Sequence, residues 1–122
     1  MGNFIFESNK SEHDIINVIN SEIEYNKDYL SDIDFYGKTP IAHAMDSFNL
    51  FAVKILIEKF EVNKHQIVYI NNSNNPYSVL EYANLIYQQQ LKINHDYFNK
   101  NGTIKLTDND VIAKKIVEYL NN

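Results

Sequence analysis

The sequence predicts an all-α domain built from pairs of short helices. Apolar residues recur at three- and four-residue spacing in several separate segments, and this is the period of an amphipathic helix. Residues that favour the first turn of a helix precede these segments, and polar clusters with Asn, Gly or Pro separate them. The 122 residues fit one domain and no linker divides them, so we expect residues 1–122 to fold as a single unit.

The first expected helix begins at Ser11, whose hydroxyl can accept a hydrogen bond from an amide of the first turn. We expect this helix to end near Tyr25. Its buried stripe consists of isoleucines at helical spacing, which are Ile15, Ile16, Ile19 and Ile23. A polar segment follows, and it predicts a loop or hairpin in which Gly37 supplies a turn residue of positive φ.

Thr39 and Pro40 mark the start of a second, short helix. We expect the Thr39 hydroxyl to cap it, and Pro40 loses no hydrogen bond at the first helical position. A polar break at Asp46 and Ser47 separates this helix from a third, which we place at about residues 49–59. Because the break is so short, we expect the two helices to pack antiparallel.

The second half of the chain predicts two more helices. Residues 62–75 fit either a helical turn or a short strand, and we favour the helix. The fourth helix is expected at about residues 77–92. Asn101-Gly102 is a tight-turn pair, which predicts a loop or small hairpin insertion near residues 93–107. The closing helix is expected to start near Thr107 and to end at Leu120.

One segment of the chain, residues 34–63, carries a recognisable pattern. It reads DFYGKTPIAHA over residues 34–44 and VKILIE over residues 53–58, followed by Val62 and Asn63. In order and spacing these residues resemble the ankyrin repeat, whose signature contains Asp, Gly, Thr-Pro-Leu, Ala, Val-x-x-Leu-Leu and Val-Asn. The sequence departs from that signature at Ala42, where the family usually has His, and His43 lies one place later.

Two weaker units flank this clear repeat. Residues 76–83 read PYSVLEYA, with Ser-Val-Leu in place of Thr-Pro-Leu, and the expected closing helix would be the outer helix of that unit. The helix at residues 11–25 would be the outer helix of an earlier unit. The resemblance therefore implies an ankyrin-like helix-pair solenoid of about three units, since one pair cannot bury its apolar face alone.

The resemblance also implies a function, because ankyrin-like proteins are typically recognition scaffolds that present variable residues at loop tips and on inner helices. Residues at the variable positions of the clear repeat are Phe35, Tyr36, Lys38, Asp46 and Ser47. Matching positions in the weaker unit are Asn74, Asn75 and Tyr77. We expect these residues to bind another protein. The alternative for the two aromatic rings of residues 35 and 36 is that they pack on residues 29–30.

Composition restricts the class of partner. The net charge is −5 and the chain has no Arg, which argues against nucleic acid and favours a basic protein partner. The charge could also serve solubility alone. No apolar run approaches the length of a membrane span, and the chain has no Cys, so we expect a cytoplasmic protein without disulfides.

The sequence predicts no catalytic, cofactor-binding or metal site, because it has no nucleophile elbow, no phosphate-binding glycine loop and no His pair at metal-ligand spacing. We therefore expect a non-enzymatic inhibitor or immunity-type protein that neutralises a partner, possibly a bacterial toxin domain. One alternative is an effector or adaptor that engages a host protein. An alternative of another class is a small hydrolase that uses Asp32, Asp34 and Asp46 near His43.

Overall fold

The computed structural model describes residues 11–102 and 108–122. Within these residues the chain is mostly helical, as predicted, with five α-helices and one antiparallel pair of strands. In chain order the elements are α1 (Glu12–Tyr25), α2 (Pro40–Asp46), α3 (Leu50–Glu58), β1 (Ile67–Ile70), β2 (Pro76–Ser78), α4 (Val79–Asn101) and α5 (Asp108–Leu120). None of the helices in the described ranges combines the length and the apolar character that a membrane span needs.

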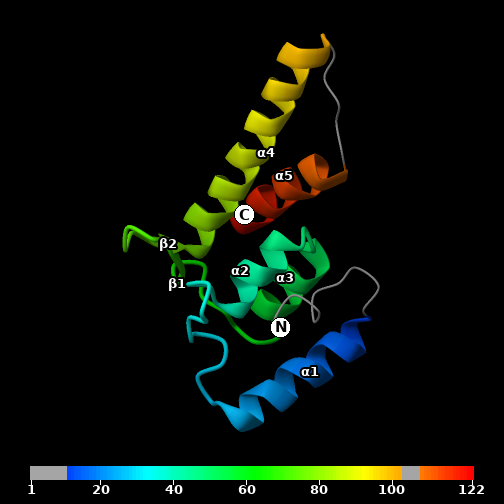
Figure 1. The fold of residues 1–122 in the computed structure, drawn as a ribbon. Helices are drawn as coiled ribbons and strands as arrows, with labels where there is room; N and C mark the ends of the chain where they lie inside the picture. Colours follow the sequence, from blue (N-terminus) through cyan, green and yellow to red (C-terminus); the bar gives the residue numbers. More distant parts are fainter. Residues whose placement is uncertain (1–10, 103–107) are drawn as a thin grey trace.

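The helices form three layers. The α2–α3 pair lies between α1 on one side and the α4–α5 pair on the other (Figure 1). α3 contacts both α1 and α5, and α2 contacts α4. The core follows these contacts, and its largest fully buried apolar side chains come from every helical layer and from β1: Ile15, Ile19, Ile41, Met45, Val53, Leu56, Val68, Val79 and Leu120. Burial of these side chains is the main force that holds the layers together.

The starts of the helices agree with the sequence analysis at one position and differ at another. The Ser11 hydroxyl accepts from the amide of Asp14 at 3.2 Å, as predicted. The predicted cap by the Thr39 hydroxyl is wrong, because this buried oxygen has no hydrogen-bond partner among the described residues. The Thr39 backbone amide instead donates to the carbonyl of Val68 at 2.9 Å. Pairing with the strand therefore fixes Thr39, and a hydroxyl cap does not.

The helix favoured within residues 62–75 is wrong, and the strand alternative is right. Residues 67–70 form β1, which pairs with β2 in an antiparallel hairpin. On its other side β1 is bonded to the segment before α2, where the Ile70 amide donates to the Gly37 carbonyl at 2.9 Å. Two neighbouring segments thus satisfy the backbone of these residues, and a short apolar run without a helix cap takes the extended form.

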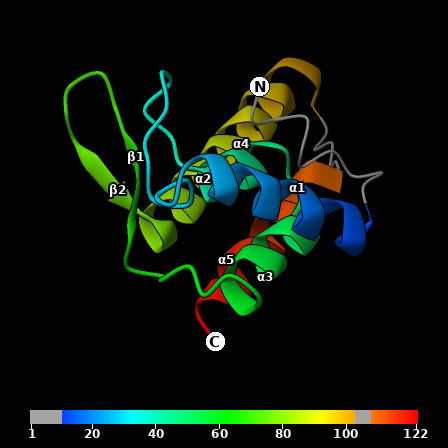
Figure 2. The same cartoon turned by 90° about the horizontal axis from the view of Figure 1, so that it is seen from below.

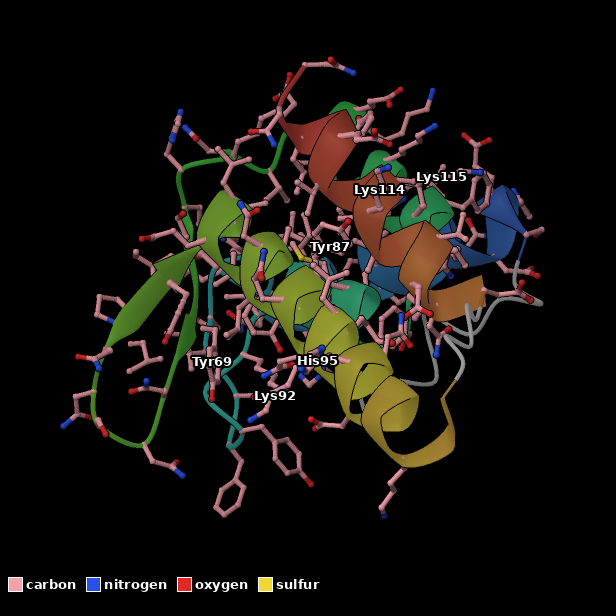
Figure 3. The ribbon with its side chains drawn as sticks, turned by 90° about the horizontal axis from the view of Figure 1, so that it is seen from above. Tyr69, Tyr87, Lys92, His95, Lys114 and Lys115 are labelled. Carbon is pink, nitrogen blue, oxygen red and sulfur yellow. The ribbon has the colours of Figure 1, made fainter. Side chains whose placement is uncertain are left out.

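The insertion expected near residues 93–107 is also different in the structure. α4 continues as a helix to Asn101, so residues 93–101 form neither a loop nor a hairpin. Residues 103–107, together with the expected helix start at Thr107, lie outside the described residues. Gly102 has φ +73°, the left-handed conformation that commonly follows the last turn of a helix. The Asn-Gly pair is therefore the end of α4, which Figure 3 shows as a long helix carrying Lys92 and His95.

Candidate functional site

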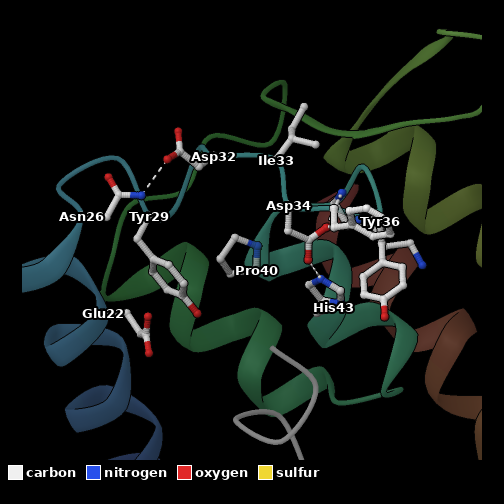
Figure 4. A pocket seen from close by; sticks show the side chains of 11 residues that line it. Glu22, Asn26, Tyr29, Asp32, Ile33, Asp34, Tyr36, Pro40 and His43 are labelled. Atoms are coloured by element: carbon white, nitrogen blue, oxygen red, sulfur yellow. Dashed lines mark hydrogen bonds and ion pairs between the residues drawn. The ribbon is translucent and has the colours of Figure 1, made fainter. Parts of the chain in front are cut away.

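The turn over residues 34–38 is held by one carboxylate. Asp34 Oδ1 accepts from the amides of Tyr36 at 2.9 Å and Lys38 at 3.1 Å, and the Asp34 carbonyl accepts from the Gly37 amide at 2.9 Å. Its other oxygen, Oδ2, bonds to Nε2 of His43 on α2 (Figure 4). His43 lies one place after the position of the ankyrin signature, and it still ties the turn to the helix by way of Asp34. The backbone of the turn is therefore fixed.

This fixed turn presents two aromatic side chains to solvent. Phe35 is 97% exposed and Tyr36 is 67% exposed. The two rings meet edge to face at 5.8 Å, and the Tyr36 ring meets the His43 ring edge to face at 6.5 Å. The alternative that both rings pack on residues 29–30 is wrong, because packing would hide them. Large exposed aromatics on a defined turn are typical of binding surfaces.

Three other predicted residues, Lys38, Asp46 and Tyr77, belong to one cluster beside this turn. Lys38 Nζ lies 2.7 Å from Asp46 Oδ2, and the Tyr82 hydroxyl donates to Asp46 Oδ1 at 2.5 Å. Lys38 Nζ also lies 5.7 Å from the centre of the Tyr69 ring, which contacts the Tyr77 ring at 5.5 Å. The structure thus joins residues from the turn, α2, both strands and α4 into one polar and aromatic cluster. Burial, followed by the bond to Asp46, raises the pKa of the Tyr82 hydroxyl far above its usual value.

The sequence analysis missed Tyr69 and Tyr82. Tyr69 could have been found from the strand alternative, since successive residues of a strand point to opposite faces. Val68 is indeed fully buried while Tyr69 is only partly buried. Tyr82 looks like an ordinary core residue of its helix in the sequence, and only the contact with Asp46, 36 positions earlier, reveals its second partner.

The remaining predicted residues lie apart from this cluster. Ser47 ends α2, and its amide donates to the carbonyl of His43 at 3.0 Å, which is a structural role. Asn74 and Asn75 lie at the tip of the β1–β2 hairpin, where the side chain of Asn71 accepts from the amide of Asn75 at 2.9 Å. Figure 2 shows that this hairpin and the turn at residues 34–38 extend from the same side of the helices.

A pocket of about 600 Å³ opens beside the turn. It lies between the end of α1, the segment that follows α1 and the start of α2 (Figure 4). The sequence analysis missed Glu22 on α1, Asn26 at the C-cap of α1 and Tyr29 in the segment that follows. Its lining is mixed acidic and aromatic: Glu22, Asn26, Tyr29, Asp32, Ile33, Asp34, Phe35, Tyr36, Lys38, Pro40 and His43. The sequence does not predict that α1 lines this pocket, because the position of α1 depends on its packing against α3.

The hydrolase alternative depends on what His43 can offer a substrate. Partial burial raises the pKa of the Asp34 carboxyl, but hydrogen bonds from His43 and from the turn amides outweigh it and hold the pKa below its usual value. An ionised Asp34 can only accept, so Nε2 of His43 carries the shared proton. Nδ1 of the same ring is buried and has no hydrogen-bond partner among the described residues. Neither ring nitrogen is therefore open to a molecule in the pocket.

The other two carboxylates of that alternative are bonded elsewhere. Asp32 accepts from the side-chain amide of Asn26 at 2.6 Å, and Asp46 is held by Lys38 and Tyr82. Over residues 11–102 and 108–122, no group of three or more His, Asp or Glu side chains is placed to hold a metal ion. The arrangement is suited to holding a turn and offering a surface.

The lowered pKa of Asp34 predicts a dependence of stability on pH. A carboxyl whose pKa falls on folding stabilises the protein above the unfolded pKa, about 3.9, and loses this effect as pH falls through the lower folded pKa. At pH 7, Asp34→Asn should therefore have a free energy of unfolding about 1 kcal/mol below that of the wild type, and it should unfold at a lower urea concentration. This difference from the wild type should become smaller in acid. Urea titrations between pH 7 and pH 2 measure both effects. Asp28→Asn, an exposed carboxylate in the preceding turn, is the control, and an equal pH dependence of both variants would contradict the linkage.

The predicted partner-binding residues thus separate into two groups, apart from Ser47, which caps the end of α2. Phe35, Tyr36, Lys38, Asp46 and Tyr77 surround one surface, while Asn74 and Asn75 occupy a hairpin tip on the same side of the molecule. Comparisons with family models, with curated proteins and with solved structures find no match to this chain. Function therefore has to be argued from this geometry and from the sequence pattern.

Proposed function

We propose that this chain is a non-enzymatic protein-binding module whose main anchors are Phe35 and Tyr36. The observation that carries the proposal is that both rings are mostly exposed on a turn whose backbone is fixed by Asp34. Aromatic side chains are enriched among the residues that dominate protein–protein affinity. A fixed turn also lowers the entropy lost on binding, because the anchors are held in place before the partner arrives.

The resemblance to ankyrin repeats supports this proposal. We propose that α2 with α3 forms the clear unit, that α4 with α5 forms a degenerate one, and that α1 is the outer helix of a third. Contacts within each pair and between successive layers suit such a stack, in which each unit touches its neighbours. The partner would then contact the loop tips and the inner, concave side of the helices, as ankyrin-like scaffolds do.

The partner that fits best is a basic protein. The chain carries a net charge of −5, and opposite charge accelerates encounter between proteins. We propose an inhibitor or immunity-type role in the cytoplasm, in which the chain neutralises a toxic enzyme such as a bacterial toxin domain. A small acidic binding domain suits that role because it can cover a basic surface without chemistry of its own.

Affinity capture from the native cell, followed by mass spectrometry, tests the proposal. Wild-type protein should retain a specific partner, and Phe35→Ala/Tyr36→Ala should bind that purified partner about 100-fold more weakly. Phe51→Ala is the matched control, since this aromatic is 45% exposed on α3 and does not line the pocket. Expression of the partner alone should be toxic. Co-expression of the wild-type chain should relieve this toxicity, and co-expression of the double variant should not. Equal affinity of the double variant and the wild type would overturn the proposed anchors.

A further inference from the structure

The pocket beside the turn has an uneven distribution of charge. Glu22, Asp32 and Asp34 line it, and the lysine among its lining residues, Lys38, is paired with Asp46 at 2.7 Å. Burial, followed by the nearby Glu22 carboxylate, raises the pKa of Tyr29 to about 12, so the Tyr29 hydroxyl stays protonated at neutral pH. The pocket therefore combines carboxylates with a neutral phenol.

The end of α1 adds to this negative character. The last turn of a helix carries a partial negative charge, which a basic side chain usually compensates. In α1 the last turn has no basic residue, and Glu22 lies there with its side chain on the pocket. The lysines at positions 92, 114 and 115 lie on α4 and α5, beyond the α2–α3 layer from α1 (Figures 1 and 3). None of these three lysines lines the pocket, and neither does Lys27, which follows α1.

Aromatic rings complete the lining. The half-buried ring of Tyr29 lines the pocket (Figure 4), and so do the exposed rings of Phe35 and Tyr36. Aromatic faces attract cations, and the attraction is greatest where water is partly excluded. A volume of about 600 Å³ is enough for a long side chain with the backbone that carries it. Carboxylates and rings around one open space are the features that a guanidinium group pairs with and stacks on.

We propose that this pocket receives a cationic side chain, most suitably an arginine, from the protein partner. The inference rests on the proposed binding function and specifies the chemistry of the partner at one position. Asp32 and Asp34 are already held by Asn26 and His43, so the cation would meet carboxylates of fixed position. Glu22, on α1, would supply a third carboxylate, and the exposed ring of Tyr36 would cover the group.

A nuclear magnetic resonance titration with N-acetyl-arginine N-methylamide tests this assignment directly. The arginine probe should shift the amide signals of residues 22–36 in a saturable way. The citrulline analogue has nearly the same shape but no charge, and it should give no saturable shift. Glu22→Gln should weaken binding of the arginine probe about fivefold. Glu24→Gln is the matched control, because it removes the same charge from the same turn of α1 without touching the pocket lining.

The outcomes separate this inference from the proposed function. If the arginine probe gives no saturable shift, or if the citrulline probe binds equally, the cationic pocket is overturned. Equal weakening by Glu22→Gln and Glu24→Gln would also overturn it, because only general charge would then be at work. Loss of the captured partner by Phe35→Ala/Tyr36→Ala would support the binding function even in that event. If the wild type binds the arginine probe but the double variant still retains the partner, the cationic pocket is supported and the proposed anchors are overturned.

Discussion

Gly37→Ala is expected to lower the free energy of unfolding by about 3 kcal/mol and to disrupt the turn at residues 34–38. Gly37 has φ +76°, a conformation that side chains with a Cβ rarely adopt. An added Cβ would also overlap the carbonyl oxygen of Ile70, which is a backbone atom and cannot rotate away. Relief of the overlap would have to move β1 from the turn, and the hydrogen bond from the Ile70 amide to the Gly37 carbonyl would be lost.

The chain offers a matched control for this effect. Gly102 has φ +73°, yet an added Cβ there would meet no atom of the described residues within 4 Å. Gly102→Ala should therefore cost only the backbone strain, about 1 kcal/mol. Urea unfolding followed by circular dichroism gives both values. Equal losses in the two variants would mean that the contact between the turn and β1 contributes nothing to stability.

Ile19→Ala should lower the free energy of unfolding by about 3 kcal/mol. Ile19 is fully buried where α1 packs on α3, and its truncation would leave a cavity between the first two layers. The effect reaches the site, because α1 and its C-cap supply Glu22 and Asn26 to the pocket. A destabilised α1 should therefore weaken binding of a cationic probe as well as stability, although Ile19 itself does not line the pocket.

Tyr25→Ala on the same helix is the control for this variant. Tyr25 is 95% exposed, so its removal should change the free energy of unfolding by less than about 0.5 kcal/mol. Denaturation should be followed by circular dichroism for the helices and by tyrosine fluorescence for the rings. One shared transition that moves only in Ile19→Ala would agree with a cooperative three-layer core. An unchanged transition in Ile19→Ala would show that α1 contributes nothing to it.

The elements that the sequence predicted well are those whose signals are local. α1 lies where Ser11 and the isoleucine stripe place it, since a cap and a 3.6-residue period act within one helix. α2 and α3 likewise follow from Pro40 and from the polar break after Met45. The exposure of Phe35 and Tyr36 also followed from the pattern at residues 34–44, through a resemblance and without any knowledge of contacts.

Other features depended on contacts between distant segments. Residues 67–70 are a strand because Gly37, Thr39 and β2 satisfy their backbone, and no window of the sequence contains all of these partners. The Asn101-Gly102 pair is compatible with a hairpin turn and with a helix end. In the structure it is a helix end, because α4 packs beside α5 and remains helical to Asn101.

By itself the sequence determined the helices of the first half of the chain, the turn at residues 34–38 and the two aromatic residues on it. These features rest on backbone preferences and spacing within a few residues. Only the tertiary structure decided the strand pairing, the length of α4 and the acidic pocket between α1 and the turn. Glu22 and His43 are far apart in the sequence, and they line one space only because burial of apolar surface packs α1 and α2 against the same core.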